Sequence, residues 1–412
     1  MYGNAAILAA LVLIYSAGAG RVGRSWLSGP IIFTGAGLIL GPAGLNALRL
    51  PLTADDLRTL AELTLAMVLF SDAAHADLRV VRRTLGLPGR LLLIGLPLTI
   101  LLGFLIGLLV FRQLDVLEVA LLAALLAPTD AALGAPVVTN AAVPPETREA
   151  LNLESGLNDG ICVPVVLILL DLAVGTEIVG STVRHIVMIV VEEIGIGAFV
   201  GLALTGGAVA ILRLAIRLNW TSEHWLHIPM VALAALCFTA AQALGGSGFI
   251  ARFTGGLLFG FLQGTRSPDL LRGASSTGEV LALLTWVLFG GPVLERLLPQ
   301  MTWGTVLYAV LSLTVIRALP VFLSLAGTGM SVGTKLFIGW FGPRGLASIV
   351  FAVIVFDAGL PGRREVAATA ACTILLSVIA HGVTANPLVG VLGRRHQSSR
   401  RAGIVLSPRP PL

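Results

Sequence analysis

The chain has 412 residues, of which 56% are hydrophobic and 12% are charged, and its formal net charge is +5. A soluble domain usually carries about a quarter charged residues, so this composition excludes an ordinary soluble enzyme or binding module and predicts an integral membrane protein. The basic residues lie between apolar runs without aromatic interleaving, which argues against a nucleic-acid partner. The three cysteines lie in apolar runs without metal-binding spacing, so we expect no cofactor.

Apolar runs of about 20 residues, bounded by charges or by Pro and Gly clusters, predict an all-α protein with thirteen membrane-spanning helices. We expect one transmembrane domain over residues 1–393 and a short basic cytoplasmic tail over residues 394–412. The predicted spans are 4–20, 27–45, 57–73, 90–111, 117–140, 150–173, 185–212, 223–243, 247–264, 274–294, 303–327, 333–357 and 366–392.

The 27 Lys and Arg residues set the predicted orientation in the bilayer. With the N-terminus outside, seventeen of them fall in cytoplasmic loops and the tail, and seven fall on the other side. This asymmetry predicts an outside N-terminus and a cytoplasmic C-terminus in the plasma (inner) membrane. The other three, Arg252, Arg317 and Arg344, lie inside spans or at their edges. Each costs at least about 2.5–3.5 kcal/mol to insert, so each needs a partner or a water-filled cavity.

The sequence Glu-Ser-Gly-Leu-Asn-Asp-Gly at 154–160 places two carboxylates within the predicted span 150–173. Asp159 lies roughly 13–14 Å from the start of this span, close to the middle of a ~30 Å hydrocarbon core. The polar residues of this stretch share one face of the predicted helix. They are Glu154, Ser155, Asn158 and Asp159.

A turn is the alternative interpretation of this stretch, because Asn-Asp-Gly is a common turn sequence. The membrane span would then begin near Ile161. Only about ten apolar residues would follow before Asp171, which is too few to cross a bilayer. The helical interpretation is therefore favoured.

Pro128, Thr129 and Asp130 interrupt the predicted span 117–140 near its middle. Proline removes a backbone donor and clashes with the preceding turn, and the ends of such broken helices form ion sites in transporters. Asp130 could balance the positive N-terminal end of the second half-helix, and Thr129 offers a hydroxyl and a freed carbonyl oxygen. The alternative is a proline kink with a Thr-Asp cap and no role in transport.

A second interruption, Trp-Phe-Gly-Pro-Arg-Gly at 340–345, falls within the predicted span 333–357. Spans five and twelve are thus both broken near their middles. This pattern is typical of two inverted six-span repeats whose broken helices meet at the substrate site. The repeats would cover about 4–173 and 223–392, joined by the span 185–212.

A carboxylate is one partner that an arginine in the membrane core can have. We expect Arg344 to pair with Glu154, and Arg317 is a second candidate cation for this carboxylate. In the alternative, Arg344 extends to the membrane surface from a tilted helix.

Four motifs together resemble the monovalent cation/proton antiporters, in the NhaP-like branch that includes animal sodium/proton exchangers. The resemblance covers nearly the whole chain in order and spacing. It implies a core domain of six helices and a dimerisation domain, working as a homodimer by an elevator-like movement of the core. The motifs are residues 128–130, 154–160, 342–348 and 381–384.

The resemblance also assigns roles to single residues. Asp159 would hold the proton and the cation in turn, with Asn158 as its neighbour and with Ser155 and Thr129 as further oxygen ligands for Na⁺. Asp130 would belong to the crossed broken helices, and Asp72 would approach the entrance to the site. Glu154 would pair with Arg344.

Protonation of Asp159 would remove the charge that holds the cation, so the two ions would compete for one site. Because residue 158 is Asn, one carboxylate of the pair titrates, which predicts one-for-one, electroneutral exchange. We therefore expect an antiporter of protons against Na⁺, with Li⁺ or K⁺ possible. A cation channel or uniporter without proton coupling is the alternative. An intramembrane hydrolase with paired carboxylates is disfavoured, because the sequence suggests no nucleophile and base arrangement.

Overall fold

The computed structural model describes residues 2–22, 25, 27–50, 53–75, 86–138, 140, 142–175, 190–222, 225–263 and 268–405. Within these ranges the chain forms helices and no β-strand, so the predicted all-α class is confirmed. Several basic residues used for the orientation lie outside the described residues, and so do the first residues of the predicted span 185–212. These basic residues are Arg24, Arg79, Arg82, Arg83, Arg184, Arg266 and Arg409.

The helices follow the predicted spans, with shifted ends. Short π-helical or 3₁₀ turns join some of them into longer rods, at Leu91–Gly95, Val190–Ile196, Phe289–Val293 and Leu298–Gln300. The α-helices are α1 (Tyr2–Val22), α2 (Gly29–Leu40), α3 (Ala54–His75), α5 (Leu87–Arg90), α6 (Leu96–Val110), α7 (Val116–Leu125), α8 (Ala131–Val138), α9 (Pro145–Val174), α11 (Gly197–Arg217), α12 (Ile228–Ala243), α13 (Gly248–Gln263), α14 (Pro268–Leu288), α15 (Leu294–Leu297), α16 (Trp303–Leu313), α17 (Val315–Ser324), α18 (Val332–Trp340), α19 (Leu346–Asp357) and α20 (Arg363–Val405).

Seven helical rods in the described part of the chain are long and apolar enough to cross a membrane. Four shorter apolar helices, α2, α7, α12 and α19, add to them. The protein is therefore an integral membrane protein. The number of thirteen crossings and the orientation stay predictions. The seven rods are Tyr2–Val22, Leu87–Val110, Pro145–Val174, Val191–Arg217, Leu270–Gln300, Trp303–Ser324 and Arg363–Arg394.

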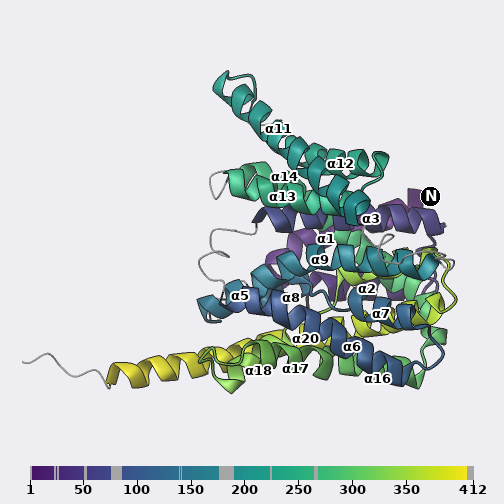
Figure 1. Ribbon diagram of the computed structural model, residues 1–412, viewed down its shortest axis with the longest axis vertical. Helices are drawn as coiled ribbons and strands as arrows, with labels where there is room; N and C mark the ends of the chain where they lie inside the picture. Colours follow the sequence, from purple (N-terminus) through teal and green to yellow (C-terminus); the bar gives the residue numbers. More distant parts are fainter. Residues whose placement is uncertain are drawn as a thin grey trace, which may run out of the picture.

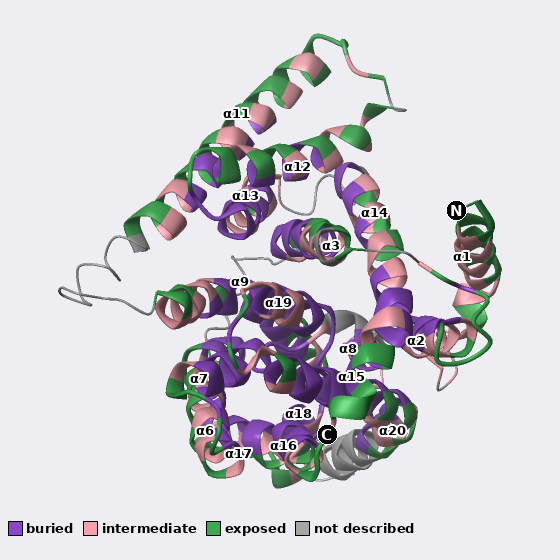
Figure 2. Ribbon diagram, turned by 90° about the vertical axis from the view of Figure 1, so that its right-hand side faces the viewer, coloured by how far each residue is buried: buried purple, intermediate pink, exposed green. Residues whose placement is uncertain are grey.

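The helices form a larger bundle and a smaller group beside it (Figures 1 and 2). The smaller group contains α11, α12 and α13, and the larger bundle contains α6, α7, α9 and α16 to α20. Helix α3 lies between them, because it packs against α13 and α14 and also against α9 and α19. Buried residues concentrate in the larger bundle around α7, α9 and α19 (Figure 2).

Small residues allow the close helix contacts of the smaller group. A Cβ atom at Gly201 on α11 would overlap the carbonyl oxygen of Ala251 on α13. Close backbone approach of this kind replaces the hydrophobic effect as the force that joins helices in lipid. Helix α1, in contrast, buries none of its side chains in the structure.

Two of the predicted spans contain a non-helical segment between two shorter helices. Helix α7 ends at Leu125 and α8 begins at Ala131, so residues 126–130 lie outside both helices. Helix α18 ends at Trp340 and α19 begins at Leu346, which leaves residues 341–345 non-helical. At the C-terminus, α20 continues to Val405, inside the predicted tail.

Candidate cation site

The stretch 154–160 is helical throughout and lies in the middle of α9. The helix begins at Pro145, five residues before the predicted start at 150, and it ends at Val174. All seven residues of the stretch are buried. The turn interpretation is therefore wrong, and the polar face of α9 points into the protein.

The two interruptions contact each other directly. The backbone N–H of Asp130 donates to the carbonyl oxygen of Pro343 over 2.8 Å. Arg344 Nη1 donates to the carbonyl oxygens of Ala127 and Pro128, at 2.5 and 3.0 Å. The helix break leaves these two carbonyls without helical partners, so the guanidinium satisfies groups that would otherwise cost free energy in the membrane.

Asp130 caps two helices at once. Its Oδ1 accepts from the backbone N–H of Leu133 in α8 over 3.2 Å, and its Oδ2 accepts from that of Leu346 in α19 over 2.7 Å. Both are helix N-terminal ends, where a negative charge is stabilising. A Cβ at Gly345 would overlap this carboxylate, which explains a glycine there. The sequence predicted that Asp130 stabilises the N-terminal end of α8, and it did not predict the contact with the N-terminal end of α19.

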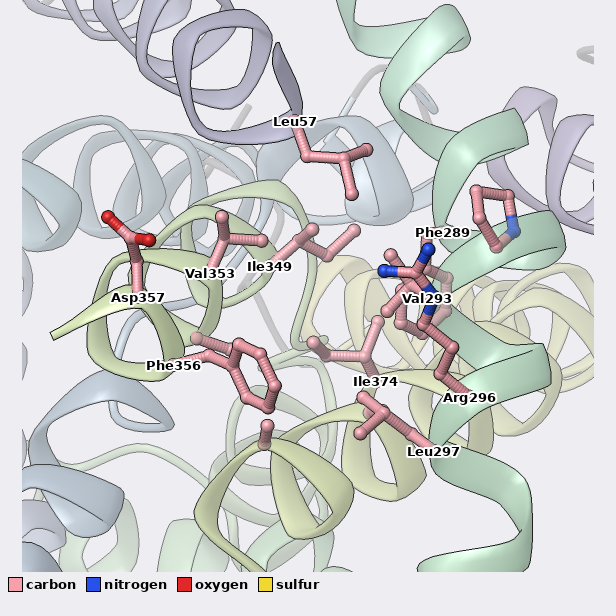
Figure 3. Close-up of a pocket in the computed structure, with 14 residues that line it drawn as sticks. Leu57, Phe289, Val293, Arg296, Leu297, Ile349, Val353, Phe356, Asp357 and Ile374 are labelled. Atoms are coloured by element: carbon pink, nitrogen blue, oxygen red, sulfur yellow. The ribbon is translucent and has the colours of Figure 1, made fainter. Parts of the chain in front are cut away.

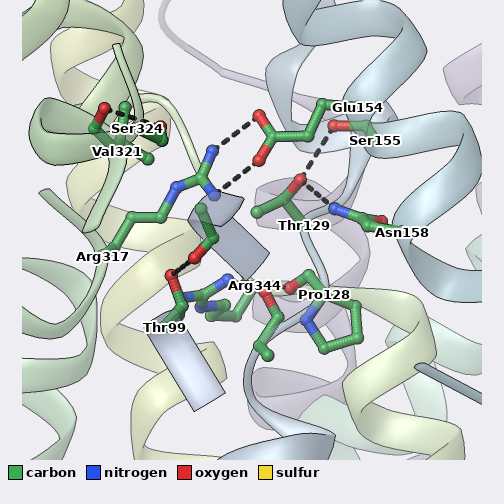
Figure 4. Close-up of polar contacts among 12 residues, drawn as sticks. Thr99, Pro128, Thr129, Glu154, Ser155, Asn158, Arg317, Val321, Ser324 and Arg344 are labelled. Atoms are coloured by element: carbon green, nitrogen blue, oxygen red, sulfur yellow. Dashed lines mark hydrogen bonds and ion pairs between the residues drawn. The ribbon is translucent and has the colours of Figure 1, made fainter. Parts of the chain in front are cut away.

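Three polar side chains meet between α9 and the first interruption (Figure 4). Thr129 Oγ1 lies 3.0 Å from Ser155 Oγ, and it accepts a hydrogen bond from Asn158 Nδ2 over 2.7 Å. All three side chains are buried. The structure thus brings together Thr129, Ser155 and Asn158 from the predicted site.

Asp159 follows these residues on α9 and is 7% exposed. Its Oδ1 has no hydrogen-bond partner among the described residues, and the same holds for Asn158 Oδ1. The Asp159 carboxylate interacts electrostatically with those of Asp130 and Asp72. Asp72 reaches this region from α3, where it packs beside Gly156. The local field therefore favours a cation.

The predicted ion pair between Glu154 and Arg344 is wrong. Glu154 instead binds Arg317 of α17 through two parallel hydrogen bonds of 2.6 and 2.7 Å, and both side chains are 1% exposed (Figure 4). The guanidinium of Arg344 faces the broken-helix carbonyls, so it is not available to Glu154. Arg344 is also fully buried, which rules out its extension to the membrane surface.

The third intramembrane arginine, Arg252, lies on α13 away from these contacts. It is fully buried, and its guanidinium lies 4.7 Å from the ring centre of Phe238 on α12. Its nitrogens have no hydrogen-bond partner within the described ranges. The contact with the ring is a cation–π interaction.

An apolar cavity of about 100 Å³ lies elsewhere, between α3, the π-helical turn Phe289–Val293, α15, α19 and α20 (Figure 3). Its charged lining residues are Arg296 and Asp357. None of the predicted site residues lines it, so this cavity is distinct from the candidate site.

Sequence reasoning assigned no role to two serines that support the interruptions, although Ser348 lies in the motif 342–348. Ser348 Oγ donates to the carbonyl oxygen of Leu125, the last residue of α7, over 2.8 Å. Ser377 Oγ accepts from the backbone N–H of Arg344 over 2.7 Å. The available signal was the spacing of Ser377 and His381, because residues four apart share one face of a helix.

The model of the transmembrane sodium/hydrogen exchanger family matches residues 7–391. The chain belongs to this family. Exchangers are transporters, which fits the expectation of a protein that is not an enzyme and disfavours a channel.

Named members of the exchanger family resemble the chain at the sequence level. The K(+)/H(+) antiporter NhaP2 of Shewanella sp. (strain ANA-3) is 26% identical over 423 residues, which span 98% of this chain and 67% of that protein. The Na(+)/H(+) antiporter NhaG of Bacillus atrophaeus is 30% identical over 162 residues, or 38% of this chain and 31% of that protein.

A solved structure shares the fold of this exchanger. The sodium proton antiporter MjNhaP1 of Methanocaldococcus jannaschii superimposes with a TM-score of 0.74 and 22% identity, over 95% of this chain and 98% of that one. The antiporter fold is thus confirmed over the superimposed part of the chain.

Proposed function

We propose that the protein exchanges protons for a monovalent cation across the membrane, with Asp159 as the residue that holds either ion. The observation that carries this proposal is the buried Asp159 Oδ1 without a hydrogen-bond partner among the described residues, adjacent on α9 to the Thr129, Ser155 and Asn158 contacts. Family membership supports the reaction class.

The chemistry of these side chains suits the exchange. A hard monovalent cation prefers oxygen ligands, and the carboxylate of Asp159 and the hydroxyls of Ser155 and Thr129 supply them. A proton on Asp159 removes the negative charge that stabilises the bound cation. Binding of one ion therefore excludes the other, and exposure of the site to each side in turn is sufficient for antiport.

We further propose Na⁺ as the preferred cation and an electroneutral one-for-one exchange. The stoichiometry rests on Asn158, which cannot titrate, beside a single carboxylate. K⁺ is the second candidate, because several relatives are named as K(+)/H(+) antiporters. Li⁺ is a third.

At the level of the fold, we propose that thirteen spans form two inverted repeats and that α7/α8 and α18/α19 are the crossed broken helices. The contacts between residues 126–130 and 341–345 support this arrangement. A homodimer with an outside N-terminus and a moving core domain completes the proposal.

Proteoliposomes with an internal pH-sensitive dye test the function. Addition of NaCl, KCl or LiCl should dissipate an imposed pH gradient for the transported cations, whereas choline chloride should have no effect. A membrane potential imposed without a cation gradient should drive no uptake. Cation currents without proton movement would instead identify a channel and overturn the proposal.

A further inference from the structure

We propose that His381 and Ser377 of α20 are positioning residues that hold the non-helical segment 341–345 in the geometry that the cation site needs. Neither side chain has a described contact with Thr129, Ser155, Asn158 or Asp159. The inference rests on the proposed exchange function, because its readout is cation affinity.

His381 holds the beginning of the segment. Its Nε2 lies 2.8 Å from the carbonyl oxygen of Trp340, the last residue of α18. A carbonyl only accepts hydrogen bonds, so Nε2 carries the hydrogen. This carbonyl also accepts from the backbone N–H of Gly342 over 2.8 Å. His381 supplies its second donor, from outside the interrupted helix.

Ser377 holds the end of the segment. Its Oγ accepts the backbone N–H of Arg344 over 2.7 Å and lies 3.1 Å from His381 Nδ1. His381 Nδ1 also lies 3.0 Å from the carbonyl oxygen of Ser377. With its hydrogen on Nε2, a neutral histidine accepts at Nδ1 from the Ser377 hydroxyl. These contacts join Arg344 through Ser377 and His381 to Trp340, and they bridge both ends of the interruption.

Trp340 has two further contacts with α20. Its indole Nε1 donates to Thr384 Oγ1 over 3.0 Å, and its ring centre lies 5.3 Å from that of His381. His381 is 1% exposed and Ser377 is fully buried. Burial excludes water, so loss of the Ser377 hydroxyl would leave the Arg344 N–H unsatisfied. Loss of His381 would remove one of the two donors to the Trp340 carbonyl.

Segment 341–345 contacts the other non-helical segment, residues 126–130. Pro343 accepts from the backbone of Asp130, and Arg344 donates to the carbonyls of Ala127 and Pro128. Thr129 lies between these contact points in the chain. A shift of segment 341–345 would therefore displace Thr129 from Ser155 and Asn158.

The test compares His381→Leu with His381→Gln in proteoliposomes, using NaCl or KCl, whichever the wild type transports. Leucine removes both hydrogen bonds, whereas the glutamine amide carries one donor and one acceptor. We expect His381→Leu to raise the KM for the cation about tenfold, since a buried hydrogen bond is lost. His381→Gln should keep KM within about twofold of the wild type.

Thr373→Val is the matched control on the same helix. Thr373 is fully buried, and its hydroxyl donates to the carbonyl oxygen of Thr369 within α20. We expect an unchanged KM for this variant. Ser377→Ala should raise KM, and the double variant with His381→Leu should be no worse than the worse single variant, because both belong to one chain of hydrogen bonds.

Suppose the wild type exchanges ions and both Ser377→Ala and His381→Leu keep the wild-type KM for the cation. This result would overturn the positioning role and leave the proposed function intact. An effect of His381→Gln equal to that of His381→Leu would also overturn it. If His381→Leu does not reach the membrane, Ser377→Ala against Thr373→Val decides the question. Absence of any exchange by the wild type would instead reject the proposed function, and the positioning role with it.

Discussion

Glu154 and Asp159 lie five residues apart on α9 and have opposite surroundings. Both oxygens of Glu154 bind Arg317, whereas Asp159 Oδ1 has no partner among the described residues. The Glu154 carboxylate is held by an arginine, whereas the Oδ1 atom of Asp159 is available to a proton or a cation. The two acidic side chains therefore have different expected effects when they are changed.

Asp159→Asn should abolish cation-dependent proton movement and leave the protein folded, because the amide keeps the shape and cannot exchange a proton. The measurement is dye-reported exchange in proteoliposomes, with size-exclusion elution as the check on folding. Asp171→Asn is the control, since Asp171 lies on the same helix and is exposed. Exchange by Asp159→Asn at the wild-type rate would remove Asp159 from the site.

Glu154→Gln should destabilise the protein by about 3–5 kcal/mol, because it leaves the Arg317 charge buried and unpaired. The double variant Glu154→Leu with Arg317→Met should recover much of this loss, since it removes both charges. Thermal unfolding in detergent measures both effects. Equal stability of Glu154→Gln and the wild type would show that the buried pair contributes little.

The sequence located the candidate site residues but did not predict which arginine binds Glu154. The stretch 154–160 and Thr129 could be located from polar residues in apolar spans. Arg317 and Arg344 are both intramembrane cations, and spacing along the chain cannot tell which faces α9. Which arginine faces α9 depends on the course of the backbone after Trp340, and that course is set by tertiary structure.

At the scale of elements, Asp130 joins the N-terminal ends of α8 and α19. Pro128 and Gly342-Pro343 indicated where helices end, because proline cannot continue a helix without strain. The second cap could not be predicted, since it requires the two half-helices to meet. Ser348 and Ser377 escaped prediction for the same reason.

Asp130→Ala should lower the free energy of unfolding by roughly 1–4 kcal/mol, because it removes two caps of about 0.5–2 kcal/mol each. It should also reduce exchange, since α8 and α19 lose their common partner. The control is Thr302→Ala, which removes the single cap of α16 at Thr305. Equal loss of stability in both variants, with normal exchange, would contradict the double-cap role.

For the whole molecule, composition predicted a membrane protein with many spans, but helix length alone does not fix their number. Helix α2 has 12 residues, or roughly 18 Å, which is shorter than the hydrocarbon core. The helices α7 and α8, which are separated by non-helical residues, are also each shorter than the hydrocarbon core.

Helix α3 lies at the boundary between the two helix groups and contacts α19 there through Arg58 and Asp357, 2.5 Å apart.

The predicted orientation can be tested by cysteine labelling of intact cells. The native cysteines are all buried, so the background should be low. A cysteine at Gly3 should react with an impermeant maleimide, and one at Ser399 should react only after the membrane is opened. The reverse pattern would show that the distribution of basic residues misleads here.

Competition between proton and cation at one carboxylate is the central claim, and the dependence of the cation KM on pH tests it most directly. In wild-type proteoliposomes with equal pH on both sides, the KM should rise about tenfold for each unit of falling pH in the acidic range, while the maximal rate at saturating cation stays constant. A KM that does not change with pH, with a maximal rate that falls instead, would contradict competition at Asp159.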